Sequence, residues 1–192
     1  TLDYGCQAVV NITEQFLDQL GLGPYVFNAP CVLGYGALGV AQKRPDLIKK
    51  LVLSQVPSWQ EMLKWKVGRD PQGILGTPIL GQLLLQMLKR KRTPQWFEAA
   101  LGNMNLHKYF NDIAQQAFSQ GAAFNLASGF QQYLSGPSPL IHKTQQPSLI
   151  IWGDLDPSHC DTCKADTSIM VHDAKVIHIE ESGHFPELET PH

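Results

Sequence analysis

The feature that most constrains the fold of this chain is a segment rich in glycine and alanine that follows a short apolar run. Residues 25–27 (Tyr-Val-Phe) suit a buried β-strand, and residues 28–30 (Asn-Ala-Pro) interrupt it. Residues 34–41 then contain three glycines and two alanines. Each glycine costs about 1 kcal/mol relative to alanine in a helix, so this helix makes sense only if its backbone lies close to a sheet. The pattern predicts a strand, a sharp turn that holds Cys31, and a closely packed helix.

Further apolar runs extend this unit into a sheet. Pro45 stops the helix, and residues 51–53 (Leu-Val-Leu) form a second buried strand. Two strands joined by one helix make a parallel βαβ unit. Residues 148–152 and 175–179 predict two more strands, so the fold class is α/β with a mostly parallel sheet. Before this unit, residues 6–20 predict an amphipathic helix with one apolar face, formed by Val9, Ile12, Phe16, Leu17 and Leu20.

The middle of the chain has a different pattern. Between residues 58 and 147, apolar side chains recur at helical spacing, and no strand of convincing alternation interrupts them. So long a helical insertion between parallel strands is typical of a cap over the active-site edge of a sheet. Its aromatic and methionine side chains would suit an apolar pocket. We therefore predict a core formed by residues 1–57 and 148–192, and a helical cap formed by residues 58–147.

Residues 25–53 resemble the nucleophile-elbow region of the α/β-hydrolase superfamily. When the chain is aligned on residues 44–46 (Arg-Pro-Asp), the family pattern Gly-x-nucleophile-x-Gly falls on residues 29–33. Cys31 then takes the nucleophile position, where serine is usual, and Ala29 and Leu33 replace the two glycines. The resemblance implies the α/β-hydrolase fold, with a helical cap inserted between strands and a core that is incomplete at both ends.

The same resemblance implies a catalytic triad. The family order is nucleophile, acid and then histidine, which here corresponds to Cys31, Asp156 and His184. Asp156 is preferred to Asp154 because the family's acid stands three residues after the glycine that ends its strand, here Gly153. In that arrangement Cys31 attacks a carbonyl, His184 moves the proton and Asp156 orients His184. The backbone N–H of Val32 is the expected oxyanion-hole donor.

Two functions from different classes stay open on this basis. The first is hydrolysis of an ester, thioester or related acyl bond of a small apolar substrate through the Cys-His-Asp triad. The second is a catalytically inactive α/β-hydrolase-like protein that keeps the pocket and binds a small molecule. The presence of both Asp156 and His184 favours the first, and the replaced elbow glycines favour the second. Neither function needs a cofactor.

Charge and composition exclude several other classes. A formal net charge of −2 gives no reason to expect a nucleic-acid partner, and no run of 18 apolar residues predicts a membrane span. The chain begins Thr-Leu-Asp without a visible signal peptide, so a cytoplasmic location is the default expectation. Residues 159–163 (His-Cys-Asp-Thr-Cys) could suggest a metal or redox pair. They lack a second pair at zinc-finger spacing, so no metal site is predicted.

Overall fold

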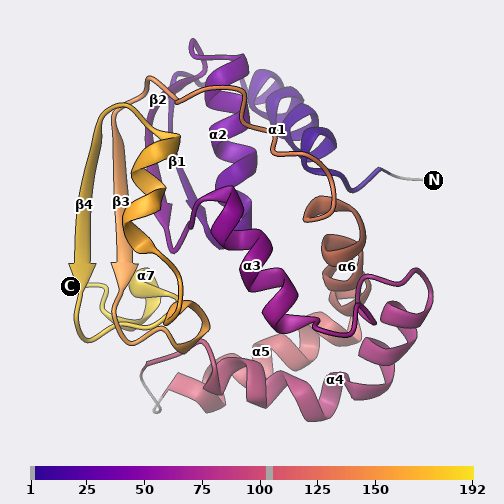
Figure 1. Cartoon of the computed structure of the whole chain (residues 1–192). Coiled ribbons are helices and arrows are strands. Elements are labelled where there is room, and N and C mark those ends of the chain that lie inside the picture. The colour runs from indigo at the N-terminus through magenta and orange to yellow at the C-terminus, as the bar shows by residue number, and fades with distance from the viewer. Residues whose placement is uncertain (1–2, 103–105) are drawn as a thin grey trace.

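The sheet has four parallel strands, and the computed structural model describes residues 3–102 and 106–192 of the chain. The strands are β1 (Tyr25–Pro30), β2 (Ile48–Ser54), β3 (Ser148–Gly153) and β4 (Ala174–Ile179), and they lie in the order β1-β2-β3-β4 (Figure 1). Each neighbouring pair is parallel. The predicted fold class and the βαβ unit are confirmed, although β2 starts at Ile48, earlier than the apolar run alone indicated.

Helices precede, connect and follow these strands. The α-helices are α1 (Cys6–Leu20), α2 (Gly34–Lys43), α3 (Trp59–Arg69), α4 (Leu80–Glu98), α5 (His107–Ser119), α6 (Ala122–Ser128) and α7 (Pro186–Glu189). Shorter helical turns are η1 (Cys31–Leu33), η3 (Gly129–Tyr133), η4 (Pro157–His159) and η5 (Lys164–Met170). Within the described ranges, none of these helices combines the length and the hydrophobicity needed to cross a membrane.

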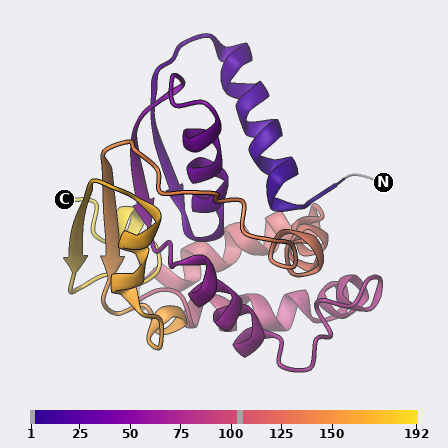
Figure 2. The same cartoon turned by 45° about the horizontal axis from the view of Figure 1, so that its top comes forward.

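The two faces of the sheet differ in burial. The register places Ala29, Leu53 and Ile150 side by side on one face, and all three are buried. This face carries the main hydrophobic core, together with α1, α2 and the first turn of α3. The opposite face, which includes Val26 at 61% exposure, is more open. The helices therefore pack mainly on one side of the sheet (Figures 1 and 2).

The small side chains of α2 make room for α1, which lies beside it (Figure 2). A Cβ atom on Gly39 would lie 2.5 Å from Cγ2 of Val10 in α1, closer than two carbon atoms can approach. Val10 is buried and its β-branched side chain has few alternative rotamers. At Gly39, the close neighbour that explains the glycine is therefore a helix, whereas the sequence pattern suggested the sheet.

The buried side of α1 is narrower than its sequence predicted. Cys6, Val10 and Leu17 are buried, whereas Ile12 and Phe16 are 61% and 57% exposed. The main partner of α1 is α2, which covers only one stripe of it, and this is why part of its apolar face stays in solvent.

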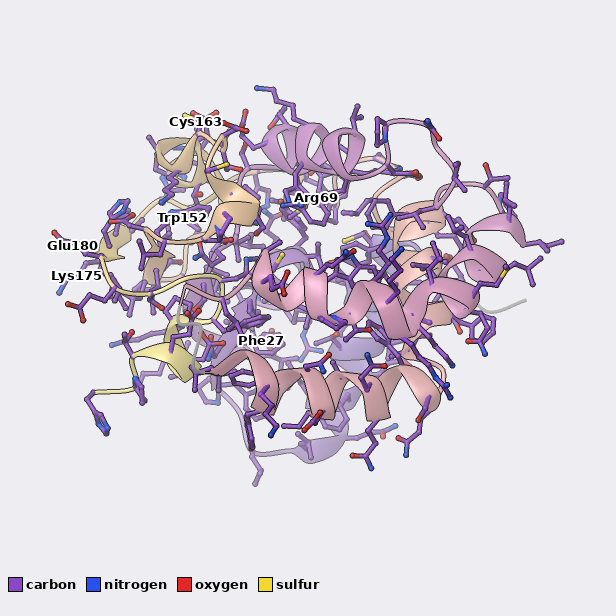
Figure 3. The ribbon with its side chains drawn as sticks, turned by 90° about the horizontal axis from the view of Figure 1, so that it is seen from below. Phe27, Arg69, Trp152, Cys163, Lys175 and Glu180 are labelled. Atoms are coloured by element: carbon purple, nitrogen blue, oxygen red, sulfur yellow. The ribbon has the colours of Figure 1, made fainter. Side chains whose placement is uncertain are left out.

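Helices α4 and α5 lie below the carboxyl ends of β3 and β4 in Figure 1 and run side by side across the view in Figure 3. Leu85, Ala123 and Ala127 form a small hydrophobic cluster of their own in this region. Trp59 and Met62 at the start of α3, by contrast, belong to the main core. The division of the chain at residues 58 and 147 stays a prediction, but α4 and α6 do pack around a core separate from that of the sheet.

The close approach of α1 and α2 predicts that Gly39→Ala lowers the free energy of unfolding by about 1–3 kcal/mol, because the added methyl group overpacks the contact with Val10. Chemical denaturation followed by circular dichroism measures this change. Gly68→Ala is the matched control, because a Cβ on that exposed residue of α3 meets nothing within 4 Å. It should stabilise the chain by up to about 1 kcal/mol. Equal effects of the two substitutions would contradict the packing described here.

Candidate active site

Cys31 lies in a strained turn between β1 and α2. Strand β1 ends at Pro30, whose backbone is extended, and Cys31 then takes a φ of 47° before the chain enters η1. A positive φ is uncommon for a residue other than glycine and costs about 1–3 kcal/mol. Such strain is concentrated at functional sites, where the surrounding structure holds it. Cys31 is therefore the residue of this turn whose backbone conformation is strained.

The two residues that replace the family's glycines are both accommodated. Ala29 is 3% exposed and packs in the main core, so its methyl group fits beside the turn. Leu33 is 56% exposed, and its side chain reaches into solvent instead of crowding the start of α2. Neither substitution prevents the strand–turn–helix geometry from forming.

Asp156 and His184 meet at the ends of β3 and β4. Nδ1 of His184 donates a hydrogen bond of 2.6 Å to Oδ2 of Asp156, and both side chains are buried. The other oxygen, Oδ1, accepts from the backbone N–H of Ser158 at 2.7 Å, which orients the carboxylate. Asp154 lies elsewhere and bonds to Lys164 and His178. Of the two aspartates, Asp156 is therefore the one that contacts His184.

A third group, the imidazole of His159, joins this pair. Sγ of Cys31, one ring nitrogen of His159 and one ring nitrogen of His184 lie within 4.8 Å of one another. The two imidazoles are stacked, with ring centroids 5.4 Å apart and planes inclined by 14°. Because Nδ1 of His184 is bonded to Asp156, its Nε2 is the nitrogen left to face the thiol. The structure brings Cys31, Asp156 and His184 together, and it adds His159.

This cluster changes the ionisation of its members. Burial alone would raise the pKa of the Cys31 thiol, but His184 and His159 outweigh that effect and lower the pKa to about 6. Burial lowers the pKa of His184, yet the facing Cys31 and Asp156 raise it to about 10. The pKa of Asp156 stays below its usual value despite burial, because His184 donates to it. At neutral pH the cluster therefore favours a thiolate beside an imidazolium.

The loops that carry Asp156 and His184 touch through their backbones. A Cβ on Gly153 would lie 2.0 Å from the carbonyl oxygen of Gly183, so no larger residue fits at Gly153. Nε2 of Gln55 donates to that same oxygen at 2.7 Å and to the carbonyl of Gly153 at 3.3 Å. Gln55 itself is fully buried with a φ of 55°. Gln55, which directly follows β2, therefore links the two segments that position Asp156 and His184.

Glu189 in α7 fixes the His184 loop from the other side. Its Oε1 accepts from the backbone N–H groups of Gly183 and Phe185, both at 3.1 Å. Its Oε2 accepts from Gly102 at 2.8 Å, beyond the end of α4. The carboxylate therefore connects the backbone around His184 to the helical region between β2 and β3.

A side chain from that helical region also reaches the turn at Cys31. The Tyr133 hydroxyl donates to the carbonyl oxygen of Val32 at 2.7 Å and holds the peptide group that follows Val32. Val32 is the residue whose N–H the sequence predicted as an oxyanion donor. The contact anchors the turn, and it could not be predicted because its partners stand 101 positions apart in the sequence.

Sequence reasoning considered His159 only as part of a possible metal or redox pair at residues 159–163, which it set aside, and it assigned no role in the site to Glu189, Gln55 or Tyr133. For His159 a signal existed, because it stands three residues after Asp156 in the same strand-exit loop, and side chains of such loops gather at one sheet edge. For the others, no local pattern distinguishes a buried connecting side chain from an ordinary surface residue.

Comparison with known proteins adds the fold family. No protein-family model and no curated protein sequence matches the chain. Among solved structures, a Nostoc protein described as an α/β hydrolase superimposes with a TM-score of 0.80 at 16% identity, over 98% of this chain and 69% of its own. Cfl2 from Burkholderia cenocepacia gives 0.78 at 16% identity, over 99% and 69%. A thermophilic esterase from Thermogutta terrifontis gives 0.66 at 16% identity, over 99% and 69%. The chain therefore has the α/β-hydrolase fold.

The lowered pKa of Cys31 predicts that its alkylation by iodoacetamide rises through about pH 6 and is already fast at pH 7, because the thiolate is the reacting form. In His184→Ala the midpoint should move upward, towards the value of about 8.5 for an ordinary thiol. Mass spectrometry of chelator-treated protein measures the rate at each pH. The exposed Cys160 and Cys163 serve as internal references. A midpoint that does not move in His184→Ala would remove His184 as the partner of the thiol.

The contacts of Glu189 predict that Glu189→Gln lowers the free energy of unfolding by about 1–3 kcal/mol, because the amide turns one acceptor oxygen into a donor facing backbone N–H groups. Alkylation of Cys31 at pH 7 should slow in the same variant, since the loop of His184 loosens. Glu187→Gln, an exposed change in the same helix, should stay within about 0.5 kcal/mol of wild type. Similar losses in both variants would show that Glu189 has no special role.

Proposed function

We propose that this chain is a hydrolase that cleaves an ester, thioester or related acyl bond through Cys31, His184 and Asp156. The observation that carries the proposal is the position of the strained Cys31 beside an imidazole that Asp156 orients at 2.6 Å. The α/β-hydrolase fold supports the same conclusion, because its strand-exit loops carry nucleophile, acid and histidine in this order. In this proposal the turn at Cys31 is a nucleophile elbow.

In the first half-reaction, the Cys31 thiolate attacks the acyl carbonyl carbon and forms a tetrahedral oxyanion. The backbone N–H of Val32, at the start of the helical turn, is the proposed donor to that oxyanion. When the intermediate collapses, the bond to the leaving group breaks and the imidazolium of His184 gives its proton to the departing alkoxide or thiolate. The products are a thioester on Cys31, a free alcohol or thiol, and neutral His184.

In the second half-reaction, neutral His184 takes a proton from a water molecule, which attacks the thioester carbonyl. Collapse of the second tetrahedral intermediate releases a carboxylic acid and restores the Cys31 thiolate and the His184 imidazolium. Asp156 holds the imidazole by Nδ1 throughout and stabilises its charged form without itself taking the proton. The substrate class is a small acyl compound, and the helical region that supplies Tyr133 is the proposed cap.

One observation favours the second candidate, a catalytically inactive binding protein. Leu33 leaves a large apolar side chain exposed two residues after Cys31, where the family's elbow has a glycine. An exposed apolar side chain there favours contact with an apolar ligand. The ester assay described next separates the two functions.

The proposal predicts turnover of p-nitrophenyl esters with short acyl chains, together with an acyl adduct on the peptide that contains Cys31. His184→Ala should abolish both, and Asp156→Asn should lower kcat by about 10²- to 10⁴-fold through loss of the correct tautomer. Absorbance of p-nitrophenolate gives the rate, and mass spectrometry of quenched samples locates the adduct.

Asp154→Asn is the matched control, because it removes the neighbouring carboxylate that contacts Lys164 and His178 instead of His184. It should leave kcat unchanged. Unaltered turnover in His184→Ala, or an adduct on another residue, would contradict the mechanism. Absence of both turnover and adduct in wild type would favour the binding function.

A further inference from the structure

The nitrogen Nε2 of His159 lacks a hydrogen-bond partner although its residue is fully buried. The other nitrogen, Nδ1, is hydrogen bonded to the Thr162 hydroxyl at 3.0 Å, which fixes the ring. Trp65 stacks on the imidazole at 6.1 Å, and Trp152 meets it edge-on at 5.9 Å. Buried polar atoms are normally paired, so an unpaired ring nitrogen held this firmly requires an explanation. The proposed triad of Cys31, His184 and Asp156 does not include this nitrogen, and the Cys31 thiol is the group that it faces.

That nitrogen belongs to a set of three possible metal ligands. Sγ of Cys31 and one ring nitrogen each of His159 and His184 lie within 4.8 Å of one another. Since Nδ1 of each histidine has a partner, Nε2 is the nitrogen that each ring has left to offer. Tetrahedral Zn²⁺ with Zn–S of about 2.3 Å and Zn–N of about 2.0–2.1 Å needs ligand atoms about 3.3–3.6 Å apart. Each pair of ligand atoms therefore has to close by at most about 1.5 Å for an ion to be held at these bond lengths.

Both histidines already have the outer contacts that zinc ligands require. A ligating imidazole usually donates its second N–H to a carboxylate, carbonyl or similar oxygen, which fixes the tautomer. His184 does so to Asp156 at 2.6 Å and lies 3.1 Å from the Ser158 hydroxyl, and His159 has Thr162. The two tryptophans around His159 add an apolar wall. Such outer contacts are typical of the histidine ligands of a metal site.

We propose that Cys31, His159 and His184 bind one Zn²⁺ ion and leave its fourth coordination position open. One sulfur and two imidazole nitrogens form a ligand set that suits zinc, and three protein ligands with an open position distinguish exchangeable or catalytic sites from closed structural ones. Binding of the ion does not depend on the proposed hydrolysis. If that function holds, zinc competes for the thiolate and for the imidazole, so the loaded protein is catalytically idle.

The test is titration of the full chain, freed of metal with a chelator, with Co²⁺ as a spectroscopic substitute for Zn²⁺. We expect one Co²⁺ per chain, an absorption band from thiolate-to-cobalt charge transfer, and displacement by Zn²⁺. His159→Ala should abolish stoichiometric binding. Thr162→Val, which removes only the outer contact of His159, should raise Kd about 10- to 100-fold. Circular dichroism verifies folding, and Thr162→Val decides the question if His159→Ala does not fold.

The double variant Cys160→Ser/Cys163→Ser is the matched control, because these exposed thiols stand near His159 in sequence but outside the ligand set. It should keep the wild-type Kd and the absorption band. Cobalt binding without the thiolate band, loss of binding in the control, or an unchanged Kd in Thr162→Val would each overturn the proposal. The absorbance readout needs no substrate, so intact binding without ester turnover would reject the hydrolase function alone.

Discussion

The site depends on the backbone contact between the loop after β3 and the loop before His184. Gly153 and Gly183 approach so closely that a single Cβ on Gly153 would lie 2.0 Å from the Gly183 carbonyl oxygen. Asp156 stands three residues after Gly153, and His184 directly follows Gly183. The backbone contact between the glycines therefore brings the carboxylate and the imidazole close together. Gln55 and Glu189 then satisfy backbone groups of these loops, which buried polar groups require.

The second constraint is electrostatic. Cys31, His159 and His184 are crowded into a small volume, and a lone charge there would be costly to bury. A thiolate beside an imidazolium lowers this cost of burial, because each charge stabilises the other. A metal cation bound by the thiolate and two neutral imidazoles lowers the same cost, because the cation then balances the thiolate charge. Hydrolysis and zinc binding are thus alternative uses of one cluster, and they differ in whether a proton or a metal ion balances the thiolate.

The sequence predicted the strands and the residues at their ends, but it did not predict the distant contacts that hold those residues in place. Apolar runs and the glycine-rich helix predicted the parallel strands, and the resemblance identified the residues that the fold brings together at the strand ends. The sequence overestimated the width of the buried stripe of α1, and Phe16, which was expected on the buried face, is 57% exposed. Periodicity shows which side chains are apolar, but it does not show how many of them a neighbouring element covers. Tyr133 and Glu189 act through contacts with distant backbone groups, which no local pattern encodes.

The presence of His159 gives a physical reason for cysteine at position 31. A serine hydroxyl stays protonated at neutral pH and is a poor ligand for zinc. A serine nucleophile therefore needs only one histidine, oriented by an aspartate, to take its proton. A thiol can ionise, and a second imidazole on its other side then either stabilises the thiolate or joins it in holding a metal. The two departures from a serine site, Cys31 and the unpaired Nε2 of His159, therefore have one common explanation.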